Sequence, residues 1–238
     1  ILVAKLTTGE LARGARWYGG TTRCPWDTMR SSGGSSAGPG AATAAGMVGF
    51  SIGTETFGSL LGPSATNGLS GLRPTYGRVS RAGSMALAWS IDKIGPMGRS
   101  IEDCMTVLQA IGGSDSRDPC AVDMPLQWQP NAPVDGLRVG IIEEEFQALS
   151  GEKETVLNQA LEDIEQLGVR LSPIRLPDYP YQEVFQIVRG AEASVFHEDL
   201  ILEDHLATLS DDSPRAWKNL LPVARLTPAT LYLKAQQI

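Results

Sequence analysis

The sequence has few of the residues that build metal sites and disulfide frameworks. Its 238 residues include three cysteines (Cys24, Cys104 and Cys120) and two histidines (His197 and His205). The cysteines form neither a CxxC pair nor a pair flanked by histidine, which argues against a zinc site. An odd number of widely spaced cysteines in a chain of this length is typical of a reduced, cytoplasmic protein.

Long hydrophobic runs and an excess of basic charge are also lacking. The longest apolar stretches, such as residues 136–142, are far shorter than the ~20 residues of a membrane-spanning helix. The formal net charge is −7, whereas nucleic-acid binding requires clustered Lys and Arg that neutralise phosphates. The chain begins at Ile1 and shows no leader with a basic start. We therefore expect neither a membrane nor a nucleic-acid partner.

The residues that are present are divided unevenly along the chain. Residues 1–118 hold 21 of the 26 glycines and carry 11 Lys and Arg against 8 Asp and Glu, a net charge of +3. Residues 119–238 hold the other 5 glycines and carry 9 basic against 19 acidic residues, a net charge of −10. We predict that the first part is a loop-rich region bearing the site. The second part is predicted to be an α/β continuation and mostly helical cover of the same domain.

The order of apolar and turn-forming segments predicts an α/β fold. Small residues favour a helix at residues 40–49 that can approach its neighbours closely. A helix at 101–111 is expected to begin at the cap Ser100, with Asp103 three positions later, and residues 137–174 match a strand–helix–strand unit. The other expected elements are strands at 1–4 and 47–54, a short helix at 59–67, and mostly helical segments at 181–209 and 216–238.

Two short serine motifs are candidates for a nucleophile, and both are weak. Ser36 is central in a GxSxG pattern, but residues 24–33 before it do not form the buried strand that a nucleophile elbow requires. Ser90 and Lys93 match SxxK, yet a glycine and a proline follow at 95–96 and the S-D-N and K-T-G triplets are absent. We interpret both as chance matches.

Two glycine-rich segments offer a better setting, residues 33–36 (GGSS) and 53–59 (GTETFGS). Backbone N–H groups at such a turn can converge on a developing oxyanion, and each donor changes the rate by roughly 10²–10³. A serine nucleophile needs a base, and no histidine is near in the sequence. A lysine acting through a second serine is a chemical alternative. From these residues alone, a purely structural glycine–serine turn is an equally good hypothesis.

Three segments resemble the amidase signature family of Ser-cisSer-Lys amidohydrolases. They are GGSSAGPGAATAAG (33–46), SIGTETFGSLLGPSATNGLSGLRPTYGRVSRAG (51–83) and SIDKIGPMGRSIEDC (90–104). The resemblance covers residues 1–113 strongly and DGLRVGII (135–142) recognisably. It implies a mixed β-sheet core flanked by α-helices, part of the amidase signature fold. It also implies hydrolysis of a small-molecule amide through an acyl-enzyme, with no metal and no organic cofactor.

The resemblance also implies roles for individual residues. Ser59 corresponds to the acyl-forming nucleophile, and Ser35 to the bridging serine, whose preceding peptide bond is cis in the family. Ser36 and Thr54 either tune the proton network or shape their loops. The backbone N–H groups that correspond to the oxyanion hole are those of Thr56, Phe57, Gly58 and Ser59.

Two departures from the family pattern bear on the substrate. Phe57 stands where many members have glycine, which keeps the backbone donor and changes only the shape of the pocket. Leu61 and Gly62 stand where many members have an arginine, so an acidic substrate group loses its obvious partner. We therefore predict a neutral or apolar amide.

The catalytic lysine of the family lies in an upstream segment resembling GxPxxVKD, which this chain does not contain. Lys5 aligns instead with a later lysine that is more often structural. We therefore expect an internal portion of a longer protein, inactive without its lysine. Two alternatives remain: the A subunit of the amidotransferase that amidates tRNA-bound Glu or Asp, which works with partner subunits, and an inactive amidase fragment. A homodimer is an assembly that the sequence leaves open.

The remaining chemically notable residues are interpreted as structural. His197 and His205 lie in an acidic, helical region, and Glu143–Glu145 follows an expected strand as a solvated edge rather than a metal site. Trp26 and Trp89 could line a pocket, but aromatic residues buried in a core are more frequent.

Overall fold

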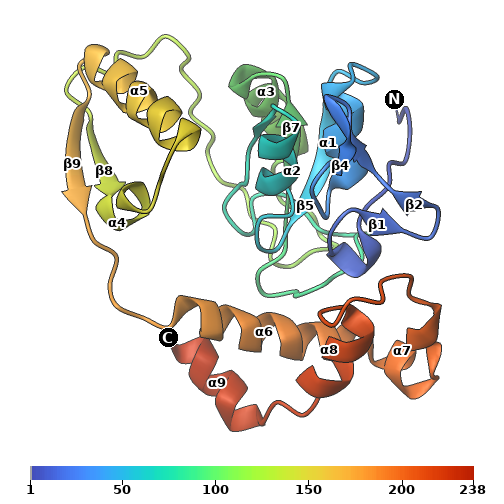
Figure 1. The fold of residues 1–238 in the computed structure, drawn as a ribbon. Coiled ribbons are helices and arrows are strands. Elements are labelled where there is room, and N and C mark those ends of the chain that lie inside the picture. The colour runs from blue at the N-terminus through green and yellow to red at the C-terminus, as the bar shows by residue number, and fades with distance from the viewer. Residues whose placement is uncertain (1) are drawn as a thin grey trace. The chain divides into compact units, whose positions relative to one another are not determined.

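The computed structural model describes residues 2–238, which form two compact units (Figure 1). One unit contains the residues up to Gln127 together with Tyr181–Ile238, and the other contains Trp128–Pro180. The first unit holds all the predicted serine-site residues. The compositional division at residue 118 stays a prediction.

The centre of the first unit is a three-stranded antiparallel sheet in the order β5-β7-β6. Strand β5 (Ser51–Glu55) pairs along its full length with β7 (Lys93–Gly98), and β6 is the short strand Ser70–Gly71. Two antiparallel hairpins precede this sheet in the chain. Their strands are β1 (Arg16–Trp17) with β2 (Gly20–Thr21) and β3 (Arg23–Cys24) with β4 (Asp27–Ser31), and a short 3₁₀ helix, Glu10–Ala12, lies before them.

Helix α1 (Ala37–Ala44) is built from small residues that allow close packing. A Cβ atom placed on Gly38 would lie 2.5 Å from the backbone nitrogen of Thr7, so only glycine fits there. The helix begins three residues before the predicted start, because Pro39 is tolerated in the first turn of a helix. It ends before Gly46, whose φ of +71° is left-handed backbone that favours glycine.

Of the other elements predicted in the first 118 residues, some are confirmed and some are wrong. Helix α3 (Ile101–Ile111) has the predicted bounds, and the Ser100 hydroxyl accepts a 3.0 Å hydrogen bond from the Asp103 N–H as predicted. Helix α2 (Leu61–Thr66) is shorter than predicted. The strand predicted at 1–4 is wrong for residues 2–4, which have no strand partner, and Ile1 lies outside the described residues. An apolar run forms a strand only where another strand pairs with it. Without such a partner, the Leu2 side chain is 83% exposed.

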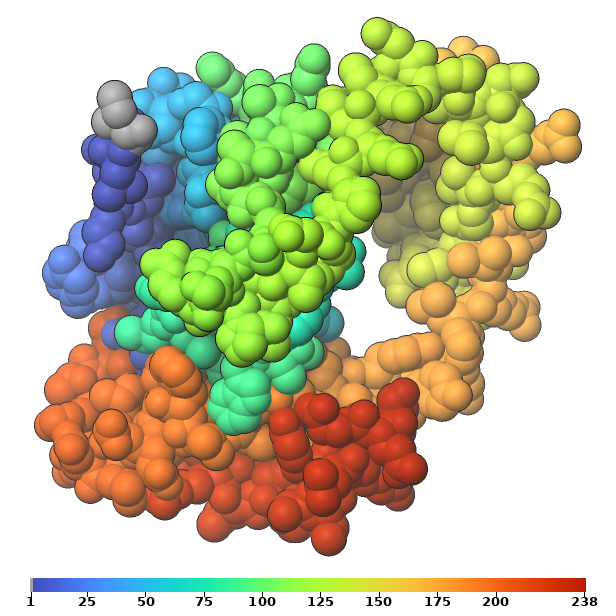
Figure 2. All heavy atoms as spheres, turned by 180° about the vertical axis from the view of Figure 1, so that it is seen from behind, coloured from blue at the N-terminus to red at the C-terminus, as the bar shows by residue number. Residues whose placement is uncertain are grey.

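Helices dominate residues 181–238, as predicted. They are α6 (Tyr181–Phe196), α7 (Glu198–Leu202), α8 (Trp217–Ala224) and α9 (Ala229–Gln237), with a 3₁₀ helix at His205–Thr208. Their buried cluster of Ala193, Trp217 and Leu221 also receives Leu87 from the N-terminal part. Figure 2 shows the orange and red atoms of these helices packed directly against the teal segment around residue 75. The helical segment is therefore part of the same unit as the serine motifs.

The second unit is a small strand–helix–strand element, as predicted. Strand β8 (Arg138–Ile142) runs parallel to β9 (Arg170–Ile174), and α5 (Glu152–Gln166) connects them after the short helix α4 (Glu143–Gln147). Parallel and antiparallel strand pairs thus occur together with helices, which is a mixed α/β architecture. Between residues 2 and 238, no helix combines the length and the apolar character needed to cross a bilayer.

Candidate active site

The fold brings the two glycine–serine segments together. The Ser36 N–H, at the start of α1, donates a 3.0 Å hydrogen bond to the carbonyl oxygen of Ser59. The Ser36 hydroxyl accepts from the Thr54 N–H (3.0 Å) and donates to the Thr54 carbonyl (3.2 Å). Ser36 therefore joins α1 to the end of β5, so that Ser35, Thr54 and Ser59 lie in one region of the structure.

Ser35 has a buried hydroxyl with no hydrogen-bond partner among the described residues. The residue is 1% exposed, and its carbonyl accepts 2.8 Å bonds from the N–H groups of Gly9 and Ala37. The Gly34–Ser35 peptide bond is cis, as the family resemblance implies. Ser35 also lines a cavity of about 230 Å³, here called the Ser35 cavity. The backbone of Ser35 is thus held by hydrogen bonds, while the hydrogen-bonding capacity of its hydroxyl is unused.

Ser59 lies in a turn, residues 56–60, that is organised around the carboxylate of Glu55. This carboxylate is fully buried. Its Oε1 accepts from the N–H groups of Gly58 and Ser59 (3.2 Å for Ser59), and its Oε2 from those of Leu60 (2.8 Å) and Leu61 (3.1 Å). Two of the four predicted oxyanion donors, Gly58 and Ser59, are therefore directed at Glu55. Thr56 and Phe57 remain as candidate donors.

Sequence reasoning missed Glu55. The available signal was an acidic side chain four positions before the candidate nucleophile, inside a glycine-rich turn. A carboxylate that accepts several backbone N–H groups makes strong charge-assisted hydrogen bonds. Glu55 therefore determines the path of the turn that carries Ser59.

Thr56 connects this turn to the loop before β7. Its hydroxyl donates a 2.6 Å hydrogen bond to Oδ1 of Asp92. The other oxygen of Asp92 accepts from the N–H groups of Leu87 (2.7 Å) and Ala88 (2.9 Å). Between Thr56 and this loop lies a second cavity of about 210 Å³, here called the Trp89 cavity. It shares Thr54 and residues 84–87 with the Ser35 cavity, so the two adjoin.

Comparison with known proteins identifies the family to which this arrangement belongs. The sequence profile described as Amidase matches residues 7–236, nearly the whole chain. The chain belongs to the amidase family. The A subunit of the glutamyl-tRNA(Gln) amidotransferase from Roseiflexus sp. (strain RS-1) is 40% identical to this amidase chain over 202 residues. That alignment covers 82% of the chain and 42% of the relative.

Solved structures confirm the predicted fold class of the amidase chain. The A subunit of the glutamyl-tRNA(Gln) amidotransferase from Thermotoga maritima superposes with a TM-score of 0.81 at 28% identity, covering all of this chain and 53% of the other. A peptide amidase in complex with the competitive inhibitor chymostatin gives a TM-score of 0.80 at 29% identity, covering 98% and 54%. The chain thus spans about two fifths of the length of the curated relatives it matches and about half of these solved chains.

The competing SxxK motif is not an active site in this amidase chain. The Ser90 hydroxyl donates a 2.6 Å hydrogen bond to Glu192, while the Lys93 ammonium donates to the carbonyl of Ile91. Burial lowers the pKa of Lys93, and the charge of Arg73 lowers it further. Ser90 and Lys93 therefore have separate partners and do not form the hydrogen-bonded pair that the motif requires.

Some of the residues predicted to be structural lie at a cavity instead of in the core or at the surface. His197 is buried and lines the Ser35 cavity, and burial lowers its pKa. His205 is exposed beside Glu203, and Lys5 is exposed as well. The expected core position of Trp89 is wrong, since it is 41% exposed and lines a cavity.

Trp26 and the acidic run also lie at the surface. Trp26 is 71% exposed, and its indole donates to the Asn67 carbonyl, so its expected core position is wrong. Glu143–Glu145 forms the exposed first turn of α4, as the expectation of a solvated edge requires. Among residues 2–238, no group of three or more His, Cys, Asp or Glu side chains is arranged to hold a metal.

Proposed function

We propose that this chain is the part of an amidohydrolase that supplies the nucleophile, the proton relay and the oxyanion donors. The Ser59 hydroxyl attacks the carbonyl carbon of an amide and passes its proton to the Ser35 relay. The C–N bond breaks, the amine leaves with a proton from that relay, and water then hydrolyses the Ser59 ester to the acid. The observation that carries this proposal is the buried hydroxyl of Ser35, which has no partner among the described residues and lines a cavity together with Thr54.

The base in this proposal is a lysine outside the chain. The Ser35 hydroxyl makes no hydrogen bond within the described residues, and a lysine amine reaching the Ser35 cavity would supply its partner. A general base contributes typically 10²–10⁴ in rate, so the 238-residue chain alone is expected to be inactive. The three cysteines are free thiols, which agrees with the cytoplasm as the proposed compartment.

The proposed substrate is a neutral or apolar small-molecule amide. Leu61 and Gly62 provide no cation beside the nucleophile turn. The chain's charge of −7 makes direct contact with nucleic acid unfavourable. A homodimer stays a proposal for the assembly.

The test is labelling of the full-length protein with a fluorophosphonate, followed by mapping of the labelled residue. We expect the label on Ser59, and loss of both label and amidase activity in Ser59→Ala. Ser116→Ala, which changes an exposed serine far along the chain, is the matched control and should label normally. Unchanged activity in Ser59→Ala would overturn the proposal.

A second candidate function is that of an amidotransferase A subunit. The observation that favours it is the 40% identity with the Roseiflexus protein of that name. Such a protein would require partner subunits and a tRNA-bound acceptor. Affinity purification of the tagged full-length protein from its own host distinguishes the two functions. Stoichiometric copurifying proteins favour the amidotransferase, whereas an active protein isolated alone favours the amidohydrolase.

A further inference from the structure

The Phe57 side chain connects the turn at residues 56–60 to the helical part of the chain. Its ring stacks on the ring of Phe185 in α6, with ring centroids 3.9 Å apart and an interplanar angle of 27°. Within the part of the chain that the structure describes, neither backbone group of Phe57 takes part in a hydrogen bond. The stacking contact with Phe185 is therefore the specific interaction that holds Phe57.

The residues on either side of Phe57 are held by other partners. On one side, the Thr56 hydroxyl donates a 2.6 Å hydrogen bond to Asp92. On the other side, the N–H groups of residues 58–61 donate to Glu55. Both acceptors belong to the central sheet or to the loop before it. Phe57 thus adds a separate attachment of the turn, to a helix from the other end of the chain.

Arg189 lies one helical turn after Phe185 in α6, on the same face of the helix. Its guanidinium carbon is 5.4 Å from the centroid of the Phe185 ring and 5.2 Å from that of Trp217 in α8. Both distances are within the ~6 Å over which an aromatic face attracts a cation. Arg189 therefore joins the Phe185 ring to the buried ring of Trp217.

The Arg189 guanidinium interacts with these rings and not with a carboxylate. It donates to the side-chain oxygen of Gln186, it has no ion-pair partner among residues 2–238, and its buried Nε makes no hydrogen bond there. Burial lowers the pKa of Arg189, and the charge of Arg13 lowers it further. An aromatic face attracts a desolvated cation more strongly than an exposed one. The two rings therefore compensate the buried charge, which ties them to each other.

The same contacts continue to the segment beside Ser35. The indole N–H of Trp217 donates a 2.8 Å hydrogen bond to the carbonyl of Leu11, and the guanidinium carbon of Arg13 lies 5.9 Å from the Trp217 ring centroid. Two residues before Leu11, the Gly9 N–H donates a 2.8 Å hydrogen bond to the Ser35 carbonyl. These contacts define an aromatic–arginine cluster that connects the nucleophile turn to this segment. Its members are Phe57, Phe185, Arg189, Trp217 and Arg13.

We propose that Phe185 and Arg189 are positioning residues of this amidase chain, which act through Phe57 on the turn that carries Ser59. This inference rests on the proposed amidohydrolase function. Neither residue touches the substrate; the stack limits the conformations of the Phe57 peptide. A preorganised site lowers the barrier because its groups need not reorganise during the reaction. Loss of the stack should therefore slow the chemical step and leave the binding of a reagent unchanged.

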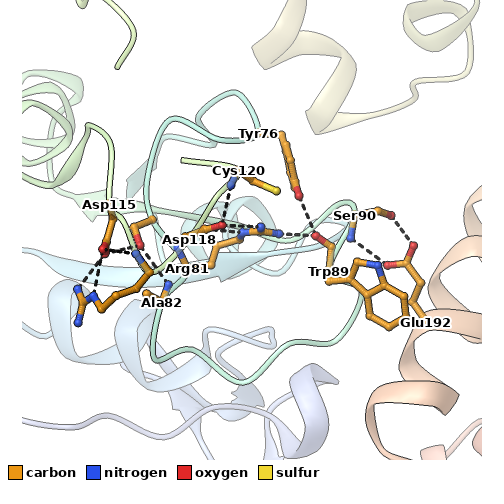
Figure 3. Close-up of polar contacts among 11 residues, drawn as sticks. Tyr76, Arg81, Ala82, Trp89, Ser90, Asp115, Asp118, Cys120 and Glu192 are labelled. Carbon is orange, nitrogen blue, oxygen red and sulfur yellow. Dashed lines mark hydrogen bonds and ion pairs between the residues drawn. The ribbon is translucent and has the colours of Figure 1, made fainter. Parts of the chain in front are cut away.

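A separate anchor keeps α6 in place when the stack is removed. Glu192 of α6 is 1% exposed and accepts hydrogen bonds from the N–H (2.9 Å) and the hydroxyl (2.6 Å) of Ser90 (Figure 3). The carbonyl of the preceding Trp89 accepts from the guanidinium of Arg81, which forms a 3.1 Å ion pair with Asp118. The loop that receives Glu192 is thus itself fixed. Variants that remove the stack are therefore expected to loosen the nucleophile turn without detaching α6.

The test measures labelling of Ser59 by a fluorophosphonate in the full-length protein, as a rate constant of inactivation and a dissociation constant of the reagent. Phe185→Leu keeps an apolar side chain but removes the ring. It should lower the rate constant about two- to tenfold, the strength of an aromatic pair, and leave the dissociation constant unchanged. Phe185→Tyr, which keeps the ring, should label at the wild-type rate. Phe146→Leu, which changes a phenylalanine of the other unit, is the matched control and should also label normally.

A double-mutant cycle separates positioning through Phe57 from a general loss of stability. In a Phe57→Ala background, Phe185→Leu should have no further effect on the rate constant, because the stacking partner is absent. Equal slowing in both backgrounds, or no slowing in the wild-type background, would overturn the inference.

The contribution of Arg189 is tested in the same assay. Arg189→Met, which removes the cation, should slow labelling, and Arg189→Lys, which keeps it, should slow labelling less. Arg175→Met is the matched control, because the Arg175 side chain is 80% exposed. An Arg189→Met protein that labels as fast as Arg175→Met would contradict the role of Arg189.

Hydrogen exchange tests the inference even if Ser59 is not labelled, in which case the proposed function fails separately. The amides of residues 58–61, which donate to Glu55, report the order of the turn without any reaction. They should exchange about two- to tenfold faster in Phe185→Leu than in the wild-type protein. Equal exchange rates in the two proteins would show that the stack does not hold the turn.

Discussion

At the scale of single residues, Glu55 sets the charge and shape of the nucleophile turn. Its carboxylate is fully buried and accepts four backbone N–H groups. A buried carboxylate is costly unless it is paired or fully hydrogen-bonded. The four backbone N–H groups of residues 58–61 supply this compensation. The turn and the carboxylate therefore stabilise each other.

Replacing Glu55 by glutamine tests this dependence. The glutamine NH₂ faces two N–H donors, and each unsatisfied donor costs about 1–3 kcal/mol. We expect a loss of about 2–4 kcal/mol in urea unfolding and labelling of Ser59 that is slower by about tenfold or more. Glu10→Gln is the control, because Glu10 also accepts backbone N–H groups, from Ser210 and Asp211. Equal labelling rates in the two variants would contradict the role of Glu55.

His197 provides a residue-scale prediction about pH. Burial lowers its pKa below the ordinary value of 6.5, so the unfolded chain binds more protons than the folded chain as the pH falls below about 6.5. The neutral imidazole makes its whole contribution to the free energy of unfolding above that pH. This contribution declines as the pH falls from 6.5 towards the lower pKa that His197 has in the folded protein. His197→Gln should flatten the pH dependence of the unfolding free energy between about pH 7 and 5. His205→Gln, which changes an exposed residue, should not.

At the scale of elements, α1 positions Ser35 by close packing of small residues. The helix buries Ala37, Gly38, Pro39, Gly40, Ala42 and Thr43. A Cβ on Gly38 would also meet the Thr7 carbonyl oxygen at 2.7 Å. The contact with residues 7–9 is therefore possible only because α1 has almost no side-chain volume on that face. This contact holds the backbone beside Ser35.

Gly38→Ala should separate α1 from residues 7–9. Overpacking of this kind costs typically 1–3 kcal/mol, and we expect that loss in thermal or urea unfolding together with slower labelling of Ser59. Gly49→Ala is the matched control, because a Cβ at Gly49 meets no atom within 4 Å. A Gly38→Ala protein as stable as Gly49→Ala would show that residues 7–9 adjust without cost.

At the scale of the whole molecule, one unit carries all the residues of this chain that the proposed reaction uses. Its first unit holds both serines, the Glu55 turn and both cavities. The Ser35 hydroxyl remains without a partner among residues 2–238. The chain spans about two fifths of the length of the curated relatives it matches.

The corresponding prediction compares two lengths of the protein. Under the proposed mechanism, Ser59 should react with a fluorophosphonate in the 238-residue chain at least about 100-fold more slowly than in a longer protein that supplies the proposed lysine base. Intact mass before and after labelling gives the rates, and far-UV circular dichroism checks that the short chain is folded. Equal rates would mean that a group within this chain acts as the base.

Local signals are sufficient for some elements and not for others. The bounds of α3 follow from Ser100 and the glycine after Ile111, because capping depends on neighbours in the sequence. The strand–helix–strand unit follows from apolar periodicity. The strand expected at residues 1–4 is wrong for residues 2–4, because strand formation depends on a partner elsewhere in the chain. The core position expected for Trp89 is wrong because hydrophobicity does not distinguish a core from a cavity wall.

The sequence by itself determined the family, the mixed α/β class and the two serine segments, since their glycine and serine spacing is a local property of the chain. Only the tertiary structure decided which groups meet. It directed two predicted oxyanion donors to Glu55, left the Ser35 hydroxyl without a partner at a cavity, and fixed Trp89 through Asp118 and Glu192. The contacts of Asp118 and Glu192 join residues far apart in the chain, and the burial of Glu55 and Ser35 depends on the packing of the whole unit.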